Sequence, residues 1–230
     1  MLRLFPSVLI LLCSLFVTAL PALADDASDA RDKVADATDV INEIMDSPDQ
    51  GIPRDLLRKS AGVAIFPGVV KAGFVFGGEY GRGVILHHDV RHNRWSAPAF
   101  FSIAAGSVGW QIGAQSTDLV LLIRSERGLK AMLKNEFKLG ADASVAAGPV
   151  GRKAQAGTDI ELKTEVWSYS RSRGLFVGLS LEGAKLNSLS DYNRGYYGKS
   201  LSAREILFDH KGMISGPARK LIEALQRFSR

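Results

Sequence analysis

The chain has 230 residues, a formal net charge of +5 and one cysteine, Cys13, close to its start. A chain of this length can bury one good hydrophobic core, so we expect a single domain. Once the leader described below is removed, the mature chain has no cysteine, which excludes disulfides and thiol chemistry.

The segment Met1 to Ala24 has the pattern of a secretory signal peptide. Arg3 supplies a positive start, Val8 to Val17 an apolar core, and Ala22 to Ala24 a small-residue cleavage site. The apolar run is shorter than the roughly 20 residues that a membrane-spanning helix needs. We therefore expect an exported, periplasmic protein that is peripheral to the inner or outer membrane.

Charge is unevenly distributed along the rest of the chain. Residues 25–50 hold nine acids and two bases, a net charge of −7, whereas residues 51–230 hold 26 bases and 15 acids, a net charge of +11. A basic exported body suits anionic partners such as lipid head groups or acidic polymers. An ordinary solvated surface is the alternative interpretation.

The acidic segment predicts an N-terminal helix. Apolar residues between Asp25 and Ser47 recur every three or four positions, and Pro48 ends the pattern because the residue before a proline avoids helical backbone angles. Its other face is acidic, so we expect it to pack on the basic body. The chain then divides into a signal peptide (1–24), an acidic helix (25–50) and one domain (51–230).

Residues Ala61 to Gly83 combine strand-like apolar residues with a glycine every few positions. Each glycine inside a helix costs about 1 kcal/mol relative to alanine, so this stretch predicts strands with bends, bulges or closely approaching backbones. The same combination of strand-like apolar residues and frequent glycines recurs at 104–123, 140–157 and 174–183. The predicted fold class is α+β: a curved, barrel-like, Gly-rich antiparallel sheet flanked by N- and C-terminal helices, with one inserted helix.

The inserted helix is predicted from Ser125, its cap, to Gly140, its end. Its basic residues lie three or four positions apart, so on a helix they share one exposed face. Predicted turns near residues 148–153 and 171–174 add further bases that could extend this surface. The predicted lipid-binding residues are Arg127, Lys130, Lys134, Lys138, Arg152, Lys153, Arg171 and Arg173.

Candidate catalytic groups are few. Ser107 sits in a near match to the G-x-S-x-G nucleophile elbow, but the residues after it predict a strand where the elbow needs a helix. We interpret His87, His88, Asp89 and His92 as a surface hairpin turn, because no second cluster supplies metal ligands. We therefore predict no catalytic residue, no metal, no cofactor and no nucleic-acid partner. A serine hydrolase using Ser107 is kept as an alternative.

A series of motifs, in order, resembles the SYLF domain family from about residue 30 to about residue 210. The motifs are Ile52-Pro53, Ala61 to Pro67, Lys71 to Gly78, Trp95 to Pro98, Gly106 to Gly113, Asp118 to Leu121, Gly148-Pro149, Ser168 to Gly174 and Tyr196 to Gly198.

This resemblance implies a non-enzymatic module that binds phospholipids. Eukaryotic SYLF proteins bind phosphoinositides, fungal ones are linked to actin, and bacterial ones are exported and described as lipid-binding. For an exported protein we expect phosphatidylglycerol, cardiolipin or phosphoinositide-like head groups as partners. A scaffold that binds an envelope protein is the alternative. The resemblance assigns no site residues, so those predicted above rest on charge alone.

Overall fold

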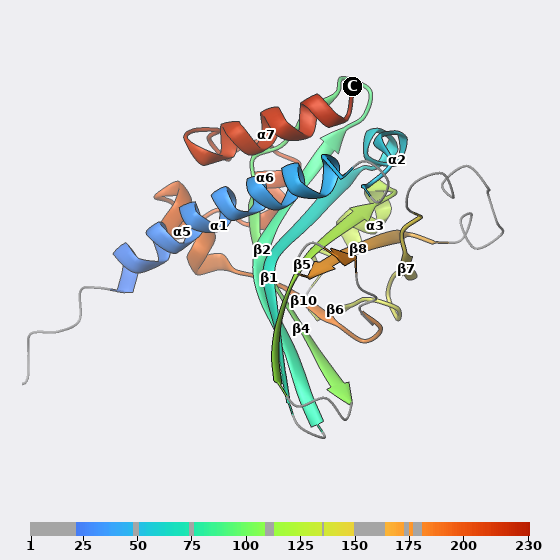
Figure 1. Cartoon of the computed structure of the whole chain (residues 1–230). Helices are drawn as coiled ribbons and strands as arrows, with labels where there is room; N and C mark the ends of the chain where they lie inside the picture. Colours follow the sequence, from blue (N-terminus) through green and yellow to red (C-terminus); the bar gives the residue numbers. More distant parts are fainter. Residues whose placement is uncertain are drawn as a thin grey trace, which may run out of the picture.

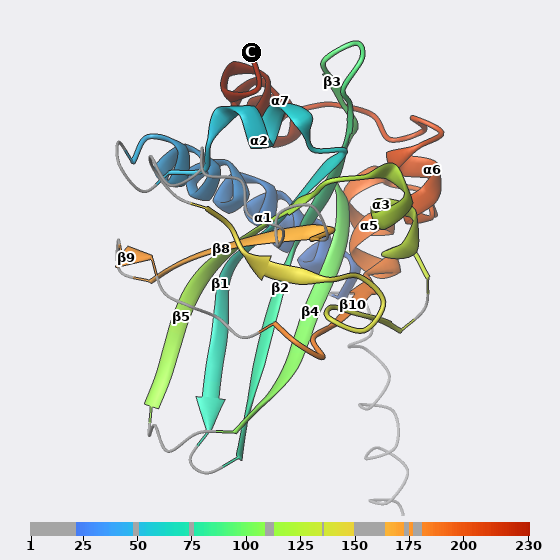
Figure 2. The ribbon, with the colours of Figure 1, turned by 90° about the vertical axis from the view of Figure 1, so that its right-hand side faces the viewer.

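A computed structural model describes residues 22–47, 51–73, 76–108, 113–134, 136–149, 164–172, 175–176 and 181–230. Within them, one curled sheet has the strand order β6-β10-β4-β2-β1-β5-β8-β7, with β3 paired to β2 and β9 to β8 (Figures 1 and 2). The strands are β1 Gly62–Gly73, β2 Phe76–Asp89, β3 Arg94–Trp95, β4 Ala99–Val108, β5 Gly113–Ile123, β6 Phe137–Lys138, β7 Val145–Ala147, β8 Val166–Ser172, β9 Leu175–Phe176 and β10 Lys185–Ser188.

Helices flank this sheet near both ends of the chain, and one short helix is inserted after β5. The predicted fold class, an α+β protein built on a curved Gly-rich sheet, is confirmed. One detail of it was wrong: β7 pairs with β8 in parallel, so the sheet is mixed. The helices are α1 Ala22–Met45, α2 Arg54–Lys59, α3 Glu126–Ala131, α5 Ser190–Tyr197, α6 Ala203–Leu207 and α7 Pro217–Phe228.

The glycines of β1 and β2 serve close backbone approach, as the sequence predicts. A Cβ on Gly83 would lie 2.1 Å from the carbonyl oxygen of Ile65, and one on Gly81 would lie 2.8 Å from Val69. The register of β1 shifts between Ile65 and Val70, where Gly68 has φ of +62°. This bulge bends the strand and explains why the sheet curls here.

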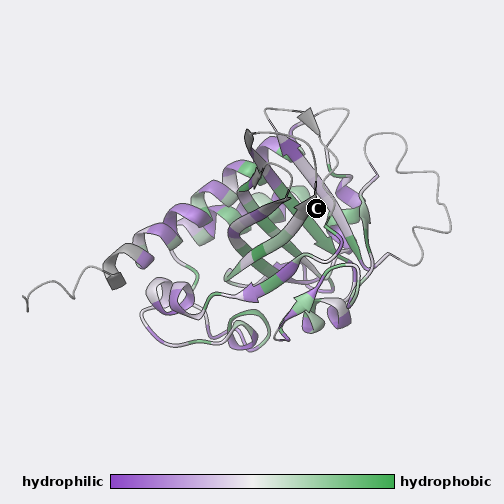
Figure 3. Ribbon diagram, turned by 90° about the horizontal axis from the view of Figure 1, so that it is seen from below, coloured by the Kyte–Doolittle hydropathy of each residue, from purple (hydrophilic) through white to green (hydrophobic). Residues whose placement is uncertain are grey.

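Alternating side chains give the sheet two separate cores, one on each face. Val63 and Ile65 of β1 point to the face covered by α1, α5 and α7, whereas Ala64 and Phe66 point to the face covered by α3 and α6. Figure 3 shows the apolar colour concentrated on the central strands, with purple and green alternating along the long helix.

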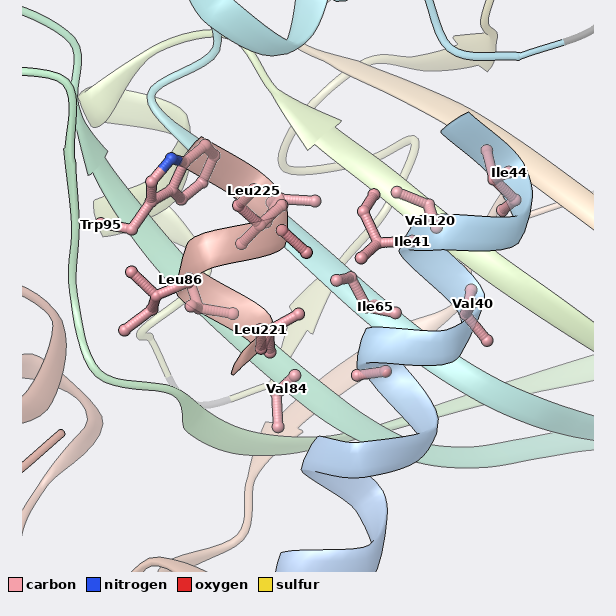
Figure 4. Packing of buried hydrophobic residues seen from close by; sticks show 14 of the residues in the cluster. Val40, Ile41, Ile44, Ile65, Val84, Leu86, Trp95, Val120, Leu221 and Leu225 are labelled. Atoms are coloured by element: carbon pink, nitrogen blue, oxygen red, sulfur yellow. The ribbon is translucent and has the colours of Figure 1, made fainter. Parts of the chain in front are cut away.

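The N-terminal helix forms much of the first core. Val34, Ala37, Ile41 and Ile44 of α1 are fully buried against the sheet, and α7 packs beside them with Leu225 (Figure 4). The predicted N-terminal helix is thus confirmed, and the apolar face of the last helix is buried as well. None of the helices in the described part of the chain is long and apolar enough to cross a membrane.

The predicted helix from Ser125 to Gly140 was wrong in its second half. Ser125 does cap a helix, with its Oγ accepting a hydrogen bond from the Gly128 N–H, but α3 ends at Ala131 and β6 follows. Glu136 has φ of +61°, which breaks a helix. Phe137 and Leu139 are buried and Lys138 between them is exposed, an alternation typical of strands. The prediction was misled because Phe137 also stands four positions after Leu133, which is a helical spacing.

Candidate functional site

The first two predicted lipid-binding residues, Arg127 and Lys130, lie exposed on α3 and are paired with acids. The Arg127 guanidinium lies 2.9 Å from a carboxylate oxygen of Glu165, and the Lys130 ammonium lies 2.8 Å from Glu126. Surface pairs of this kind contribute little stability, but each neutralises one positive charge. They reduce the positive potential that α3 offers to an anionic partner.

Lys134 and Lys138 are also exposed, but on a turn and on β6 rather than on one helix. Lys138 lies directly opposite Lys185 of β10, a residue that the sequence reasoning missed because it is 47 positions away. We call the set Arg127, Lys130, Lys134, Lys138 and Lys185 the α3–β6 surface. Five acids accompany these five bases, so the net charge here is zero; the acids are Glu126, Glu136, Asp142, Glu165 and Glu182.

Arg171 lies on the other side of the sheet, at β8. Its guanidinium lies 2.9 Å from Glu43 of α1, and only 19% of its side chain is exposed. Arg171 therefore ties α1 to the sheet and is separate from the α3–β6 surface. The predicted residues Arg152, Lys153 and Arg173 lie outside the described residues.

The alternative catalytic residue, Ser107, lies inside strand β4, where its backbone pairs with Gly77 of β2. The next described element is strand β5, so the strand-to-helix turn of a nucleophile elbow does not occur around Ser107 in the described chain. This geometry gives no support to a serine hydrolase.

The sequence placed His87 and His88 wrongly, whereas His92 lies exposed in the predicted hairpin turn. His87 and His88 lie inside β2 and are buried, while the hairpin turn begins at Val90. His88 stacks on Trp95 at 4.1 Å between ring centres, and its Nδ1 lies 3.0 Å from the carbonyl oxygen of Ser60. His87 and His88 were mistaken for surface residues because they belong to a run of polar residues that continues into the turn. Both in fact lie at the end of the long strand β2.

A larger basic region lies where α2, the β2–β3 hairpin and α7 meet, at one end of the molecule (Figures 1 and 2). All of its bases are exposed. We call this set the basic end: Arg54, Arg58, Lys59, Arg91, Arg94, Arg219, Lys220, Arg227 and Arg230.

Two buried residues, Phe228 and Trp95, join the three elements of the basic end. The guanidinium carbons of Arg54 and Arg227 lie 5.6 Å and 4.4 Å from the centre of the Phe228 ring, which brings α2 and α7 together. The indole N–H of Trp95 donates to the Ser229 hydroxyl, and that hydroxyl donates to the Asn93 side chain. These bonds hold the hairpin against the end of α7.

Within residues 54–59, 89–94 and 217–230, nine bases face three acids, so the net charge of these three segments is +6, before the acids of the neighbouring helix α1 are counted. Asp55 pairs with Arg58, and Asp89 lies 2.7 Å from His92 and 3.6 Å from Arg94. The hydrogen bond from His92 lowers the pKa of Asp89 to about 2, so this carboxylate stays charged at all ordinary pH values. The excess of positive charge nevertheless remains large.

A family model described as "Ysc84: Las17-binding protein actin regulator" matches residues 104–228, more than half of the chain. The chain belongs to the Ysc84, or SYLF, family. The resemblance stated from the motifs is thereby confirmed.

Three relatives of this Ysc84-family protein show the extent of the match. SH3 domain-containing YSC84-like protein 1 of Xenopus laevis is 38% identical over 186 residues, which cover 79% of this chain and 54% of the relative. The protein of that name from Bos taurus is 33% identical over 210 residues (90% and 60%). LAS seventeen-binding protein 3 of Saccharomyces cerevisiae is 36% identical over 162 residues (69% and 35%).

The chain thus spans about half the length of its vertebrate relatives and about a third of the yeast one. The names of these proteins concern binding and regulation, and the family description names no reaction. The partners in those names belong to the longer proteins.

Proposed function

We propose that this protein binds the surface of membranes rich in anionic phospholipids, and that it does so through the basic end. The observation that carries the proposal is the net charge of +6 gathered there on nine exposed side chains from three chain segments. A basic residue near an anionic membrane contributes about 1 kcal/mol of binding free energy. A region of this size provides enough attraction without any inserted helix.

In this proposal the protein contacts the membrane at its surface and inserts no helix. The apolar face of α7 is occupied in the core, since Leu221, Leu225 and Phe228 are buried, so this helix offers the membrane its polar face. Val90, at the turn of the hairpin, is 45% exposed and lies next to Arg91. An exposed apolar residue beside a base suits the level of the lipid head groups.

Phosphatidylglycerol and cardiolipin are the proposed lipids, because an exported protein meets them at the periplasmic faces of the envelope. Export rests on the predicted leader, Met1 to Ala24, and on nothing further. A non-enzymatic role also belongs to the proposal; the family description, which names binding and regulation, supports it.

The α3–β6 surface, where the sequence predicted lipid binding, is the competing location for the same function. Its bases are exposed, but its net charge is zero, so it attracts an anionic bilayer far less. Arg171 is already engaged with Glu43.

A protein-binding role is the second candidate function. It is favoured by the description of the family as Las17-binding and by the name LAS seventeen-binding protein 3. In this chain the basic end would then bind an acidic segment of an envelope protein.

Sedimentation of the purified protein with vesicles separates these functions. We expect no binding to vesicles of phosphatidylcholine, and strong binding once phosphatidylglycerol or cardiolipin is added. Because exposed charges are screened beyond about 10 Å at 0.1 M salt, the binding should weaken as salt is raised. If the protein stays in solution with anionic vesicles even at low salt, lipid binding is wrong and the protein-binding role takes its place.

A further inference from the structure

A cleft with a volume of about 320 Å³ lies beside α2, at the junction of β5, α3 and the start of β8. Its volume is at the small end of the range for ligand pockets, so it suits a small polar molecule rather than a nucleotide or an acyl chain. The residues that line it are Leu56, Lys59, Ser60, Arg124, Ser125, Thr164, Glu165 and Trp167.

The charge of the cleft favours an anion. Its one acid, Glu165, is already engaged: the Ser125 hydroxyl donates to one carboxylate oxygen at 2.8 Å, and Arg127 donates to the other at 2.9 Å. The same two hydrogen bonds lower the pKa of Glu165. The two bases of the lining, Lys59 and Arg124, leave a positive excess.

The two bases are positioned differently. Arg124 Nη1 donates to the carbonyl oxygen of Thr164 at 2.9 Å, which holds the guanidinium at the wall of the cleft. Lys59 ends α2, is exposed, and forms no ion pair with any residue that the structure describes. One fixed planar cation and one adaptable ammonium are a combination that recognises phosphate oxygens.

The rest of the lining suits the remainder of such a ligand. Leu56 and Trp167 supply an apolar patch against which a short carbon chain packs. The cleft therefore has a charged part and a part for a short carbon chain.

We propose that this cleft binds a phosphate-bearing head group of the size of glycerol phosphate. The source is either a phospholipid, in which case the inference rests on the proposed membrane binding, or a free phosphate ester. Lys59 belongs both to the basic end and to the cleft, so a lipid held at the basic end has its head group next to the cleft.

The test is a titration of the purified protein with glycerol 3-phosphate and with inorganic phosphate, followed by calorimetry and by amide NMR shifts. We expect saturable binding of glycerol 3-phosphate, with shifts concentrated at residues 56–60, 124–125 and 164–167. Lys59→Gln and Arg124→Gln should each weaken it about tenfold or more, since each removes a charged hydrogen bond to the ligand.

Arg194→Gln is the matched control, because Arg194 is an exposed helical base that pairs with Asp191, lies outside the basic end and does not line the cleft. It should leave the affinity unchanged. Arg124 also donates a hydrogen bond to the Thr164 carbonyl oxygen. A thermal unfolding curve of Arg124→Gln therefore checks that this variant is folded. The exposed Lys59 keeps the test decisive if Arg124→Gln fails to fold.

Vesicles containing phosphatidylglycerol form the second arm, and dihexanoyl phosphatidylglycerol below its micelle concentration forms the third. Binding of the short-chain lipid that is lost in Lys59→Gln identifies a lipid head group as the source. Binding of glycerol 3-phosphate without any vesicle binding identifies a free ester and removes the proposed membrane function. Vesicle binding without saturable binding of either soluble ligand overturns the cleft and leaves the membrane function intact.

Discussion

The basic end and the α3–β6 surface contain similar side chains but differ in net charge. The basic end has nine bases and three acids, whereas the five bases of the α3–β6 surface are accompanied by five acids. Two of those acids form direct ion pairs, with Arg127 and Lys130. A run of lysines and arginines therefore does not by itself attract anions; what matters is the charge that remains after the neighbours in space are counted.

The two regions also differ in how they are assembled. The α3–β6 surface comes mostly from one stretch of chain, residues 126–138, and so it is visible in the sequence. The basic end joins residues 54–59, 89–94 and 217–230, which come together only because α2 and the hairpin pack on α7. The region with the larger excess of charge is the one that depends on the fold.

The largest loss of stability should come from weakening the packing of α7 on the sheet. Leu225 is fully buried between α7 and the sheet (Figure 4), so Leu225→Ala leaves a cavity and should lower the free energy of unfolding by about 2–5 kcal/mol. Urea unfolding measures this. Val70→Ala, at a position that is 46% exposed, is the control and should change the stability by less than about 1 kcal/mol. A loss that small for Leu225→Ala would show that α7 is not held as described.

Charge reversal tests the two regions directly. Arg91, Arg219 and Lys220 are exposed and form no ion pair within the described residues. Replacing all three by glutamate should weaken binding to phosphatidylglycerol vesicles about 100-fold or more, since each base contributes about 1 kcal/mol. Vesicle sedimentation at low salt gives the affinity.

The matched control reverses three lysines of the α3–β6 surface: Lys134, Lys138 and Lys185. It changes the net charge of the protein by the same amount, but the affinity should fall much less. If this variant loses more binding than the first, the surface predicted from the sequence is the membrane-binding one, and the basic end is not.

Arg171 should matter for stability and not for binding. Arg171→Gln removes its ion pair with Glu43, and because Glu43 is mostly exposed, solvent screening limits the loss in unfolding free energy to about 1 kcal/mol. Urea unfolding and vesicle sedimentation of the same variant give both numbers. A clear loss of vesicle binding at unchanged stability would return Arg171 to the lipid-binding residues.

The smallest effect should be a dependence of stability on pH from His87, which lies between β2 and α3. Burial lowers its pKa below the ordinary value of about 6.5. The unfolded chain then binds the proton more readily, so the contribution of His87 is present above pH 6.5 and is lost as pH falls toward the lowered pKa.

Thermal unfolding at pH 7 and at pH 5 measures this loss, and most carboxylates stay ionised over that range. The midpoint should fall on acidification, and His87→Gln should reduce the fall. An equal fall in the variant would assign the pH dependence to other groups.

The sequence predicts the parts of this protein whose pattern is local. A spacing of three and four residues suffices to predict α1, where Val34, Ala37 and Ile41 form one stripe, and glycine density suffices to predict the close contact at Gly83. The predicted helix over 125–140 failed because Phe137 stands four positions after Leu133, which fits a helix, whereas pairing with β10 makes Phe137 part of a strand.

The site was harder to predict than the fold. Arg219 and Lys220 are visible as the polar side of the last helix, but nothing local links them to Arg54 or Arg91. That link depends on Phe228, Trp95 and the elements that they join. A charge pattern read along the chain found the α3–β6 bases and missed both their acids and the larger excess elsewhere.

The core that α1 and α7 share has a consequence for the order of folding. It brings together residues 30–45 and residues 218–228, which are separated by most of the chain. Contacts between such distant segments form slowly, because a long loop must close before they stabilise anything. During synthesis from the N-terminus, the part of this face that α7 covers stays exposed until the last helix emerges, and a chaperone that shields apolar surface would act in that interval.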